Sequence, residues 1–244
     1  KRRLPLAELV RMAELAPPSR DYLGALRPAA ETSEIRIIAE IKRASPSRGV
    51  IRENIDVLAL AAAYIAGGAA VISVLTDGKY FCGSLEDLSR VSSYGTVPTL
   101  RKDFVIDRYQ IYEAVVAGAS SALLIAGLVD VSELAELVAL ERSLGLEPQV
   151  EAHDENEVEQ ALRAGATIIG INNRDLRTFT VELATTERLR KLIPADRIVV
   201  SESGIHSAAD VARLRAAGVQ AIHVGESLMT SADPAHKLRE LVGR

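Results

Sequence analysis

Eight short apolar segments recur along the chain and constrain its fold more than any other feature. The segments are rich in Ile and Val and mostly apolar on both faces, which is typical of parallel strands that are covered on each side. Their starts lie about 20 to 35 residues apart, the length of one strand-helix unit. They begin near Ile35 (IRIIAEI), Ala70 (AVISVL), Thr96 (TVPTL), Ser121 (SALLI), Glu147 (EPQVEA), Thr167 (TIIGIN), Ile198 (IVVSE) and Gln220 (QAIHVG).

The stretches between these segments carry helical spacing and helix boundary residues. Apolar residues recur at three- and four-residue intervals, for example at Leu134, Leu137, Val138 and Leu144, with Glu141 on the same face. Glycines that can close a helix in the left-handed conformation precede the next strands, at Gly67-Gly68, Gly118, Gly145, Gly165 and Gly218. Asp130, Asp154 and Ser207 are expected N-caps.

Eight strand-helix units in 244 residues predict an α/β chain folded as one (β/α)8 TIM barrel, residues 1–244. A doubly wound parallel sheet is the structural competitor. No GxGxxG or GxxxxGK[ST] follows a strand, which argues against dinucleotide and P-loop sites. Residues 1–30 are expected to add N-terminal helices, one or two of them between Leu4 and Arg27, covering one barrel end.

Composition limits the partners and the compartment. With 29 basic and 33 acidic residues the net charge is −4, so no basic surface for nucleic acid is expected. No apolar run is long enough to cross a membrane. A single cysteine, Cys82, excludes an intrachain disulfide and fits a cytoplasmic protein. The four histidines lack metal-ligand spacing, so no metal site is predicted, and both a monomer and a homodimer remain open.

Polar residues gather at the predicted carboxyl ends of the strands, where a barrel of this kind carries its chemistry. They are Glu40 and Lys42, Lys102, Glu151, Asn172 and Arg174, and Glu202 and Ser203. The period of two along a strand places Glu40 and Lys42 on the same inward face. Each residue alone fits a solvated strand end or a structural ion pair, but together they favour an enzyme, because buried charges are costly.

Two glycine-containing turns favour a phosphate site. Ser203-Gly204 follows the seventh strand and Gly225-Glu226 the eighth, where backbone N–H groups and a helix start can hold an anion. Ordinary tight turns are the alternative. The segment around Ser45, after the first strand, is expected to close over the same group or to be a flexible turn.

Seven motifs in order resemble the indole-3-glycerol phosphate synthase family across nearly the whole chain. They are IIAEIKRASPSRG at 37–49, SVLTDGKYFCGSLEDL at 73–88, LRKDFVIDRYQIYEA at 100–114, VEAHDE at 150–155, IGINNRDLRTF at 169–179, VSESGI at 200–205 and VGESLM at 224–229. The resemblance implies ring closure and decarboxylation of 1-(2-carboxyphenylamino)-1-deoxyribulose 5-phosphate in tryptophan biosynthesis, a phosphorylated small-molecule substrate and no cofactor.

The resemblance also assigns roles to residues. It implies that Lys102 is the general acid and Glu151 the catalytic glutamate. The remaining active-site positions match Glu40, Lys42, Asn172, Glu202 and Ser203, and Arg174 follows in the same motif. Phe104 and Phe81 are expected to form the wall against the aromatic ring of the substrate, or else to be plain core.

Two polar residues depart from the apolar pattern usual in the family. Gln149 shares the strand parity of Glu151, and His223 that of Gly225, so both are expected to point into the barrel. In one interpretation they satisfy each other or nearby polar atoms. In the other the pocket is altered, and His223 is a general base for proton abstraction from carbon of an aromatic substrate.

Two further alternatives belong to other functional classes. Phosphoribosylanthranilate isomerase is a similar barrel with a similar phosphate, but its Cys and Asp acid-base pair is not evident at the strand ends. A non-catalytic binding barrel would leave the cost of the charged residues unexplained.

Overall fold

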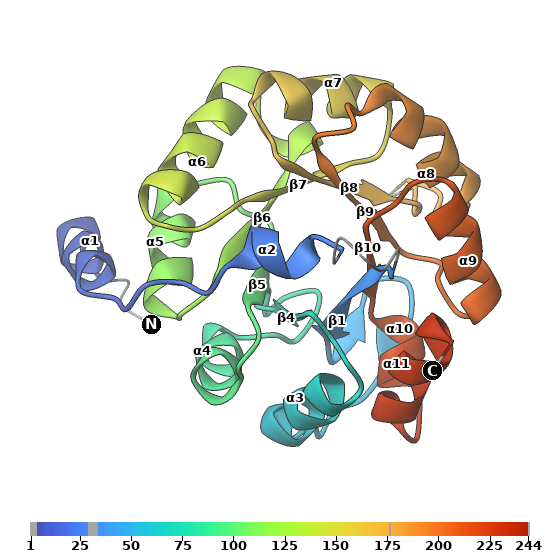
Figure 1. Cartoon of the computed structure of the whole chain (residues 1–244). Coiled ribbons are helices and arrows are strands. Elements are labelled where there is room, and N and C mark those ends of the chain that lie inside the picture. The colour runs from blue at the N-terminus through green and yellow to red at the C-terminus, as the bar shows by residue number, and fades with distance from the viewer. Residues whose placement is uncertain (1–3, 29–33, 176, 244) are drawn as a thin grey trace.

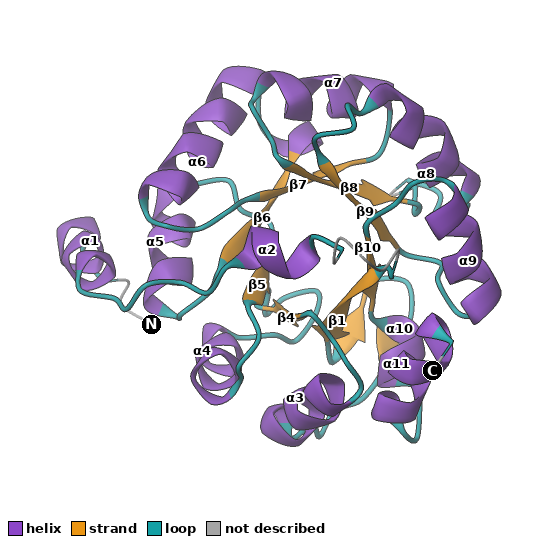
Figure 2. Cartoon of the chain, viewed as in Figure 1, coloured by secondary structure: helices purple, strands orange, loops and turns teal. Residues whose placement is uncertain are grey.

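A computed structural model describes residues 4–28, 34–175 and 177–243, and it contains a closed barrel of parallel strands (Figures 1 and 2). Around the barrel the strands are β1 (Arg36–Ile41), β10 (Ala221–Val224), β9 (Ile198–Glu202), β8 (Ile168–Asn172), β7 (Gln149–Ala152), β6 (Ser121–Ile125), β5 (Thr99–Lys102) and β4 (Val71–Leu75). All eight predicted strands are confirmed, each beginning within three residues of its expected start. The TIM barrel fold is confirmed and the doubly wound sheet is excluded.

Helices surround the barrel as an outer ring (Figure 2). They are α3 (Val57–Ala66), α4 (Leu85–Tyr94), α5 (Arg108–Val116), α6 (Val131–Ser143), α7 (Glu155–Arg163), α8 (Ala184–Leu189), α9 (Ala208–Ala216), α10 (Glu226–Met229) and α11 (Pro234–Val242), with short 3-10 turns η1 (Ala126–Leu128) and η2 (Arg190–Leu192). The expected N-caps are confirmed, because Asp130, Asp154 and Ser207 each accept backbone N–H groups of the first turn. The expected glycines have positive φ, at Gly68, Gly118, Gly145, Gly165 and Gly218.

The segment after β1 is paired rather than irregular. β2 (Ala44–Ser45) and β3 (Gly49–Val50) form a short antiparallel hairpin, with Gly49 at a φ of 66° in its turn. This hairpin brings Ser45 to the rim of the barrel, next to the carboxyl end of β1.

Two helices precede the barrel, α1 (Leu6–Glu14) and α2 (Tyr22–Leu26); residues 1–3 and 29–30 of the expected extension lie outside the described residues. α1 packs beside α5 on the barrel wall, whereas α2 lies across the end of the barrel where the strands begin (Figure 1). Arg36, the first residue of β1, donates to the Ala25 carbonyl of α2 at 2.9 Å. Tyr22 and Leu26 are buried among the inward side chains of the strands, so α2 closes that end of the barrel.

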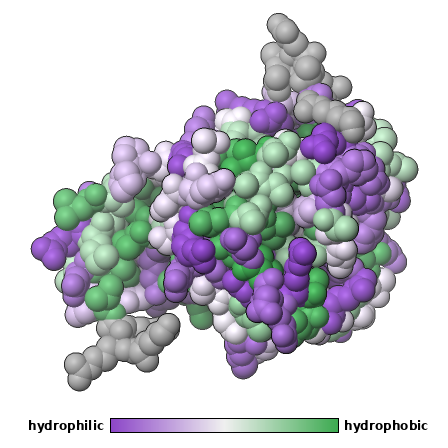
Figure 3. Space-filling model, turned by 90° about the horizontal axis from the view of Figure 1, so that it is seen from below, coloured by the Kyte–Doolittle hydropathy of each residue, from purple (hydrophilic) through white to green (hydrophobic). Residues whose placement is uncertain are grey.

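The apolar core has two layers, as expected for strands that are buried on both faces. Inward residues such as Ile38, Leu100 and Ile168 fill the barrel interior, while residues such as Ala39, Leu124 and Ile169 pack against the helices. On the face seen from below, hydrophobic residues reach the surface in patches among hydrophilic ones (Figure 3). No helix within the described ranges is long and apolar enough to span a membrane.

One carboxyl group is buried in the outer core. Glu141 of α6 is fully buried, and its Oε2 accepts the N–H of Ala122 at 3.0 Å. Burial raises the pKa of this carboxyl to about 8, although the Ala122 N–H acts in the opposite direction. At neutral pH Glu141 therefore holds its proton.

We expect the Glu141→Gln variant to lose part of the pH dependence of stability. Because the pKa is raised in the folded state, stability from this group is complete below about 4.5 and is lost as pH rises toward 8, by up to about 1.4 kcal/mol per pH unit. Urea unfolding at pH 5, 6.5 and 8 tests this slope. The matched control is Glu136→Gln, on the exposed face of α6. Equal slopes in the wild type and both variants would contradict the assignment.

Candidate active site

The carboxyl ends of the strands surround a cavity of about 790 Å³. Most of the predicted site residues line it. They are Glu40, Lys42, Ser45, Lys102, Phe104, Glu151, Asn172, Arg174, Glu202, Ser203, Gly204, His223, Gly225 and Glu226. Gln149 is not among the lining residues; it lies fully buried beneath the cavity floor. The structure thus brings the polar and charged residues at the carboxyl ends of β1, β5, β7, β8 and β9 to one concave surface.

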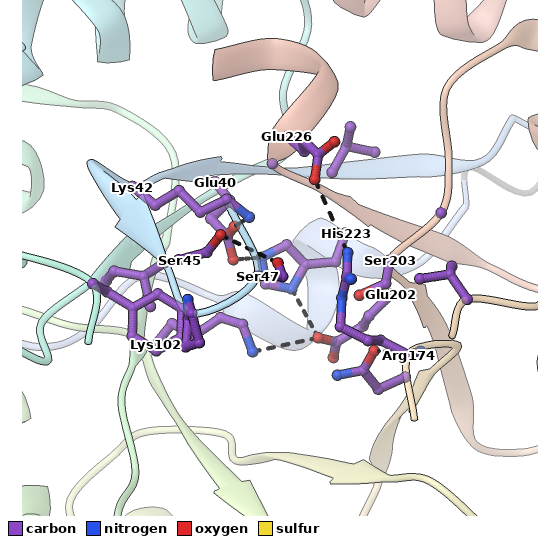
Figure 4. A pocket seen from close by; sticks show the side chains of 18 of the residues that line it. Glu40, Lys42, Ser45, Ser47, Lys102, Arg174, Glu202, Ser203, His223 and Glu226 are labelled. Atoms are coloured by element: carbon purple, nitrogen blue, oxygen red, sulfur yellow. Dashed lines mark hydrogen bonds and ion pairs between the residues drawn. The ribbon is translucent and has the colours of Figure 1, made fainter. Parts of the chain in front are cut away.

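Lys102 lies at the centre of this surface. Its Nζ is 2.9 Å from Glu151 Oε2 and 3.5 Å from Glu202 Oε2, and Figure 4 shows the ammonium directed at Glu202. Burial alone would lower the pKa of Lys102, but the carboxylates of Glu151, Glu202 and Glu40 together raise the pKa above its ordinary value. Lys102 is therefore an ammonium at neutral pH and can donate a proton to a strongly basic oxygen.

Glu151 is held by donors on both oxygens. Oε2 accepts from Lys102, while Oε1 accepts from Asn172 Nδ2 at 3.1 Å and contacts His153 Nε2 at 3.2 Å. Burial would raise the pKa of this carboxyl, but the Lys102 and His153 cations lower the pKa well below its usual range. Glu151 is thus a buried carboxylate, able to accept a proton from a bound molecule.

A second ion pair comes from the first strand of the barrel and the residue that follows it. Glu40 of β1 and Lys42 lie on the predicted inward face, with Lys42 Nζ 2.7 Å from Glu40 Oε1. Burial alone would raise the pKa of Glu40, but the Lys42 and His223 cations lower the pKa below its usual range. Glu40 is therefore a carboxylate, and Lys42 can turn from it toward an anionic ligand.

His223 lies between two carboxylates on the cavity floor (Figure 4). Its Nδ1 is 3.3 Å from Glu202 Oε2 and its Nε2 is 3.3 Å from Glu40 Oε2, ion-pair contacts whose angles fall short of hydrogen bonds. Burial would lower the pKa of the ring, but Glu202 and Glu40 raise the pKa above its usual range. Carboxylates only accept, so a ring that faces one on each nitrogen is stable as the imidazolium.

These contacts decide between the interpretations of the two unusual polar residues. An imidazolium has no free lone pair, so the hypothesis that His223 is a general base is not supported. Gln149 and His223 do not bond to each other, but each contacts nearby polar atoms, as the first interpretation also allowed. Both contact Glu202, Gln149 through a hydrogen bond from Nε2 to Oε1 of 2.8 Å.

A glycine of β8 and a glycine directly after β10 make room for the carboxylates. A Cβ on Gly225 would lie 2.2 Å from Glu40 Oε1 and 3.0 Å from Lys42 Nζ. A Cβ on Gly170 of β8 would lie 2.2 Å from Glu202 Oε1. The bare backbone at both positions therefore lets two charged side chains bend into the barrel.

The turn after β9 has the backbone expected of an anion-binding loop. Ser203 and Gly204 both have positive φ, 69° and 78°, and α9 begins a few residues later. A Cβ on Gly204 would lie 2.4 Å from Val181 Cγ1, so a side chain would not fit there. Consecutive residues in this conformation can turn their N–H groups toward the same anion.

Two arginines at the rim contact Glu226, which follows β10. Arg48 of the β2–β3 hairpin lies 2.5 Å from Glu226 Oε1, and Arg174 lies 4.0 Å from Glu226 Oε2. The Glu226 side chain would repel an anion, so only its backbone suits the predicted phosphate contact. Arg48 and Arg174 provide the positive charge at this side of the cavity.

Aromatic residues form part of the cavity wall, as the motifs suggest. Phe104 lies 6.2 Å from Phe81 and 6.4 Å from Tyr80 between ring centroids. Phe179, in the loop after β8, also lines the cavity and has a positive φ of 59°. These rings give an aromatic ligand an apolar surface beside the charged floor.

Sequence reasoning assigned no role to two side chains that contact the site residues, His153 and Tyr22. His153 follows Glu151 at the same strand parity, a signal that was available; burial opposes its charge, yet Glu151 and Glu157 raise its pKa to about 10. Tyr22 gave no such signal, because a terminal helix brings it beneath the site. Arg48 belongs to the segment around Ser45 that was expected to close over the phosphate, and the hairpin places it at the rim of the cavity. No group of three or more His, Cys, Asp or Glu residues suited to a metal occurs among the residues that the structure describes.

Comparisons with known proteins agree with the geometry. A family model described as "Indole-3-glycerol phosphate synthase" matches residues 1–241. An indole-3-glycerol phosphate synthase of Roseiflexus sp. (strain RS-1) is 49% identical over 249 residues, which cover 99% of this chain and 91% of the relative. The synthase of Dehalococcoides mccartyi (strain CBDB1) is 46% identical over 246 residues, covering 99% and 93%.

Solved structures support the fold at lower identity. A 3-hexulose-6-phosphate synthase from Salmonella typhimurium superposes with a TM-score of 0.69 at 13% identity, covering 86% of this chain and 97% of the other. At that identity the likeness concerns the barrel alone.

Proposed function

Because this chain belongs to the indole-3-glycerol phosphate synthase family, we propose that its barrel mouth closes the indole ring of 1-(2-carboxyphenylamino)-1-deoxyribulose 5-phosphate. The enzyme is a carboxy-lyase of tryptophan biosynthesis, and the reaction releases carbon dioxide and water. The observation that carries the assignment of residues is the buried Lys102 ammonium between the carboxylates of Glu151 and Glu202.

The first step forms the carbon–carbon bond of the new ring. The aromatic carbon that bears the carboxylate attacks the ketone carbon, and the carbonyl electron pair moves to oxygen. Lys102 is suited to give this oxygen its proton, because its raised pKa keeps it charged until a strongly basic atom develops. Lys42 is suited to the substrate carboxylate, since its Nζ lies at the same surface.

The later steps remove carbon dioxide and water. Breaking the bond to the carboxylate returns its electron pair to the ring system. Loss of the hydroxyl then needs an acid for the oxygen and a base for a ring proton. Glu151, a carboxylate at neutral pH, is suited to be the base, with Asn172 and His153 holding it in place and a lysine as the acid.

The phosphate is proposed to bind at the turn after β9 and beside the rim arginines. Ser203 and Gly204 offer backbone N–H groups, and Gly225 and Glu226 line the same cavity. Arg174 and Arg48 would exchange part of their contact with Glu226 for the phosphate. The aromatic wall around Phe104 is proposed to hold the anthranilate ring.

We expect Arg174→Gln to raise KM about tenfold with a smaller effect on kcat, because one charge-assisted contact to the phosphate is worth at least about 1.4 kcal/mol. Steady-state kinetics of indole-3-glycerol phosphate formation, followed by fluorescence, measures both constants. The matched control is Arg177→Gln on the same loop, whose side chain is 91% exposed and paired with Asp175. A KM equal to that of the control would refute the phosphate contact.

The same assay tests the proposed function itself. A folded enzyme should convert the carboxyphenylamino-deoxyribulose phosphate to a fluorescent indole product with release of one carbon dioxide. The absence of product from folded protein would contradict the proposal. No observation favours the isomerase alternative, because Cys82 lies in an exposed loop and is not among the cavity residues.

We also propose that this protein is a cytoplasmic enzyme. It is proposed to bind a phosphorylated small molecule and to bind neither nucleic acid nor membranes. The net charge of −4 and the single cysteine support this assignment. Size-exclusion chromatography with light scattering would distinguish a monomer from a homodimer.

A further inference from the structure

A chain of polar side chains runs through the barrel from the helix α2 to the catalytic cavity. The Tyr22 hydroxyl donates to Gln149 Oε1 at 2.7 Å, and Gln149 Nε2 donates to Glu202 Oε1 at 2.8 Å. The other oxygen of Glu202 contacts Lys102 at 3.5 Å and His223 at 3.3 Å. The closed end of the barrel is thereby connected to the lysine that the proposed function uses.

The hydrogen bonds along these polar side chains allow only one orientation of the Gln149 amide. A carboxylate can only accept, so the amide nitrogen of Gln149 has to face Glu202 and its oxygen has to face Tyr22. Burial, followed by the charge of Glu202, raises the pKa of Tyr22 well above its ordinary value, so the phenol keeps the proton it donates. The amide is fixed from both ends.

Burial makes these contacts energetically significant. Tyr22, Gln149 and Glu202 are between 0% and 3% exposed. Gln149 Nε2 is the one hydrogen-bond donor to Glu202 Oε1 within the described part of the chain. Without it this oxygen would be buried and unsatisfied, which costs about 1 to 3 kcal/mol or more for a charged group and favours movement of the side chain.

We propose that Gln149 and Tyr22 are positioning residues of the active site, which hold the Glu202 carboxylate at its place beside Lys102 from the opposite end of the barrel. Neither residue lines the cavity, so neither touches the substrate. Their effect passes through Glu202, whose Oε2 helps to direct the Lys102 ammonium. Helix α2 therefore supports catalysis as well as closing the barrel. This inference rests on the proposed function.

Kinetics of the full chain with Gln149→Met and Tyr22→Phe tests the proposal. Gln149→Met keeps the length of the side chain and removes its hydrogen bonds, and Tyr22→Phe removes one oxygen atom. We expect kcat to fall about tenfold in the first and about threefold in the second, with KM changed less than about twofold, because a small displacement of a catalytic group mainly affects the chemical step.

The double variant distinguishes positioning from simple stability. If Tyr22 acts through Gln149, adding Tyr22→Phe to the Gln149→Met variant should lower kcat no further. The matched control is Ser92→Ala, which deletes another buried hydroxyl bond, the 2.8 Å contact with Thr99 on the outer side of β5. It should lower the melting temperature and leave kcat unchanged.

Two results would overturn the inference: kcat within about twofold of the wild type in both folded single variants, or additive losses in the double variant. Tyr22→Phe retains the whole ring, so it keeps the test decisive if Gln149→Met folds poorly. Failure of the proposed function gives a different result, because the wild type would then form no indole product at all.

Discussion

Replacing Lys102 with methionine is expected to lower kcat about 10³-fold, because positioned proton transfer contributes about 10² to 10⁴ in rate. Methionine keeps the length and apolar stem of the side chain but cannot carry a proton. The substrate would still meet the aromatic wall and the phosphate turn, so KM should change much less than kcat. The measurement is steady-state formation of indole-3-glycerol phosphate by fluorescence.

The matched control is Lys191→Met, which removes an exposed lysine of η2 on the outside of the barrel. It should retain the wild-type kcat. If Lys102→Met retained more than about a tenth of the wild-type kcat, Lys102 would not be the general acid that the site suggests.

Removal of the ammonium should also change the ionisation of its neighbours. In the wild type Lys102 lowers the pKa of Glu151, against the effect of burial. In Lys102→Met only the His153 cation would still oppose the effect of burial, so Glu151 would take up a proton at a higher pH. As the pH is lowered, the residual activity that depends on the Glu151 carboxylate should therefore be lost at a higher pH in the variant than in the wild type.

The fold followed from the sequence because barrel strands are short, apolar on both faces and regularly spaced. Strand and helix boundaries depend mainly on local chemistry. Two examples are the strand predicted from IRIIAEI at Ile35 and the helix end predicted at Gly118, before SALLI. The largest shift, at the strand predicted from Thr96, has a local reason as well. Pro98 has no N–H for a strand ladder, and β5 begins directly after it, at Thr99.

The positions of the site residues also followed from strand parity, but their ionisation did not. Parity placed Glu40 and Lys42 on one face and directed His223 and Gln149 inward, as the structure has them. The charge of His223 depends on Glu40 and Glu202, which come from two other strands. A pattern within one strand cannot reveal which charged groups the neighbouring strands will place beside it, and those groups set its ionisation.

The contact between α2 and the residues beneath the active site could not be predicted from the sequence for a similar reason. The sequence predicts a helix near Tyr22, but nothing in that segment states which strand its hydroxyl meets. The contact with Gln149 joins residues 127 positions apart and exists because the barrel is closed. Long-range pairings of this kind are a property of the assembled fold.

Replacing His223 with leucine is expected to destabilise the protein by about 3 to 5 kcal/mol near pH 6, because it leaves two buried carboxylates without their shared cation. Glu40 keeps Lys42 and Glu202 keeps Lys102, yet Glu40 Oε2 and Glu202 Oε2 both lose the contact at 3.3 Å. Urea unfolding followed by circular dichroism measures the change. His236→Leu, in the exposed part of α11, is the matched control.

The size of this effect should depend on pH with a definite sign. The folded pKa of His223 is raised, so the stability it provides is complete below its unfolded value of about 6.5 and is lost as pH rises through the folded pKa. The wild type and His223→Leu should therefore differ most at pH 6 and less in strongly alkaline solution. A difference that grows with pH would mean that the ring is neutral in the folded protein, which would restore His223 as a possible base.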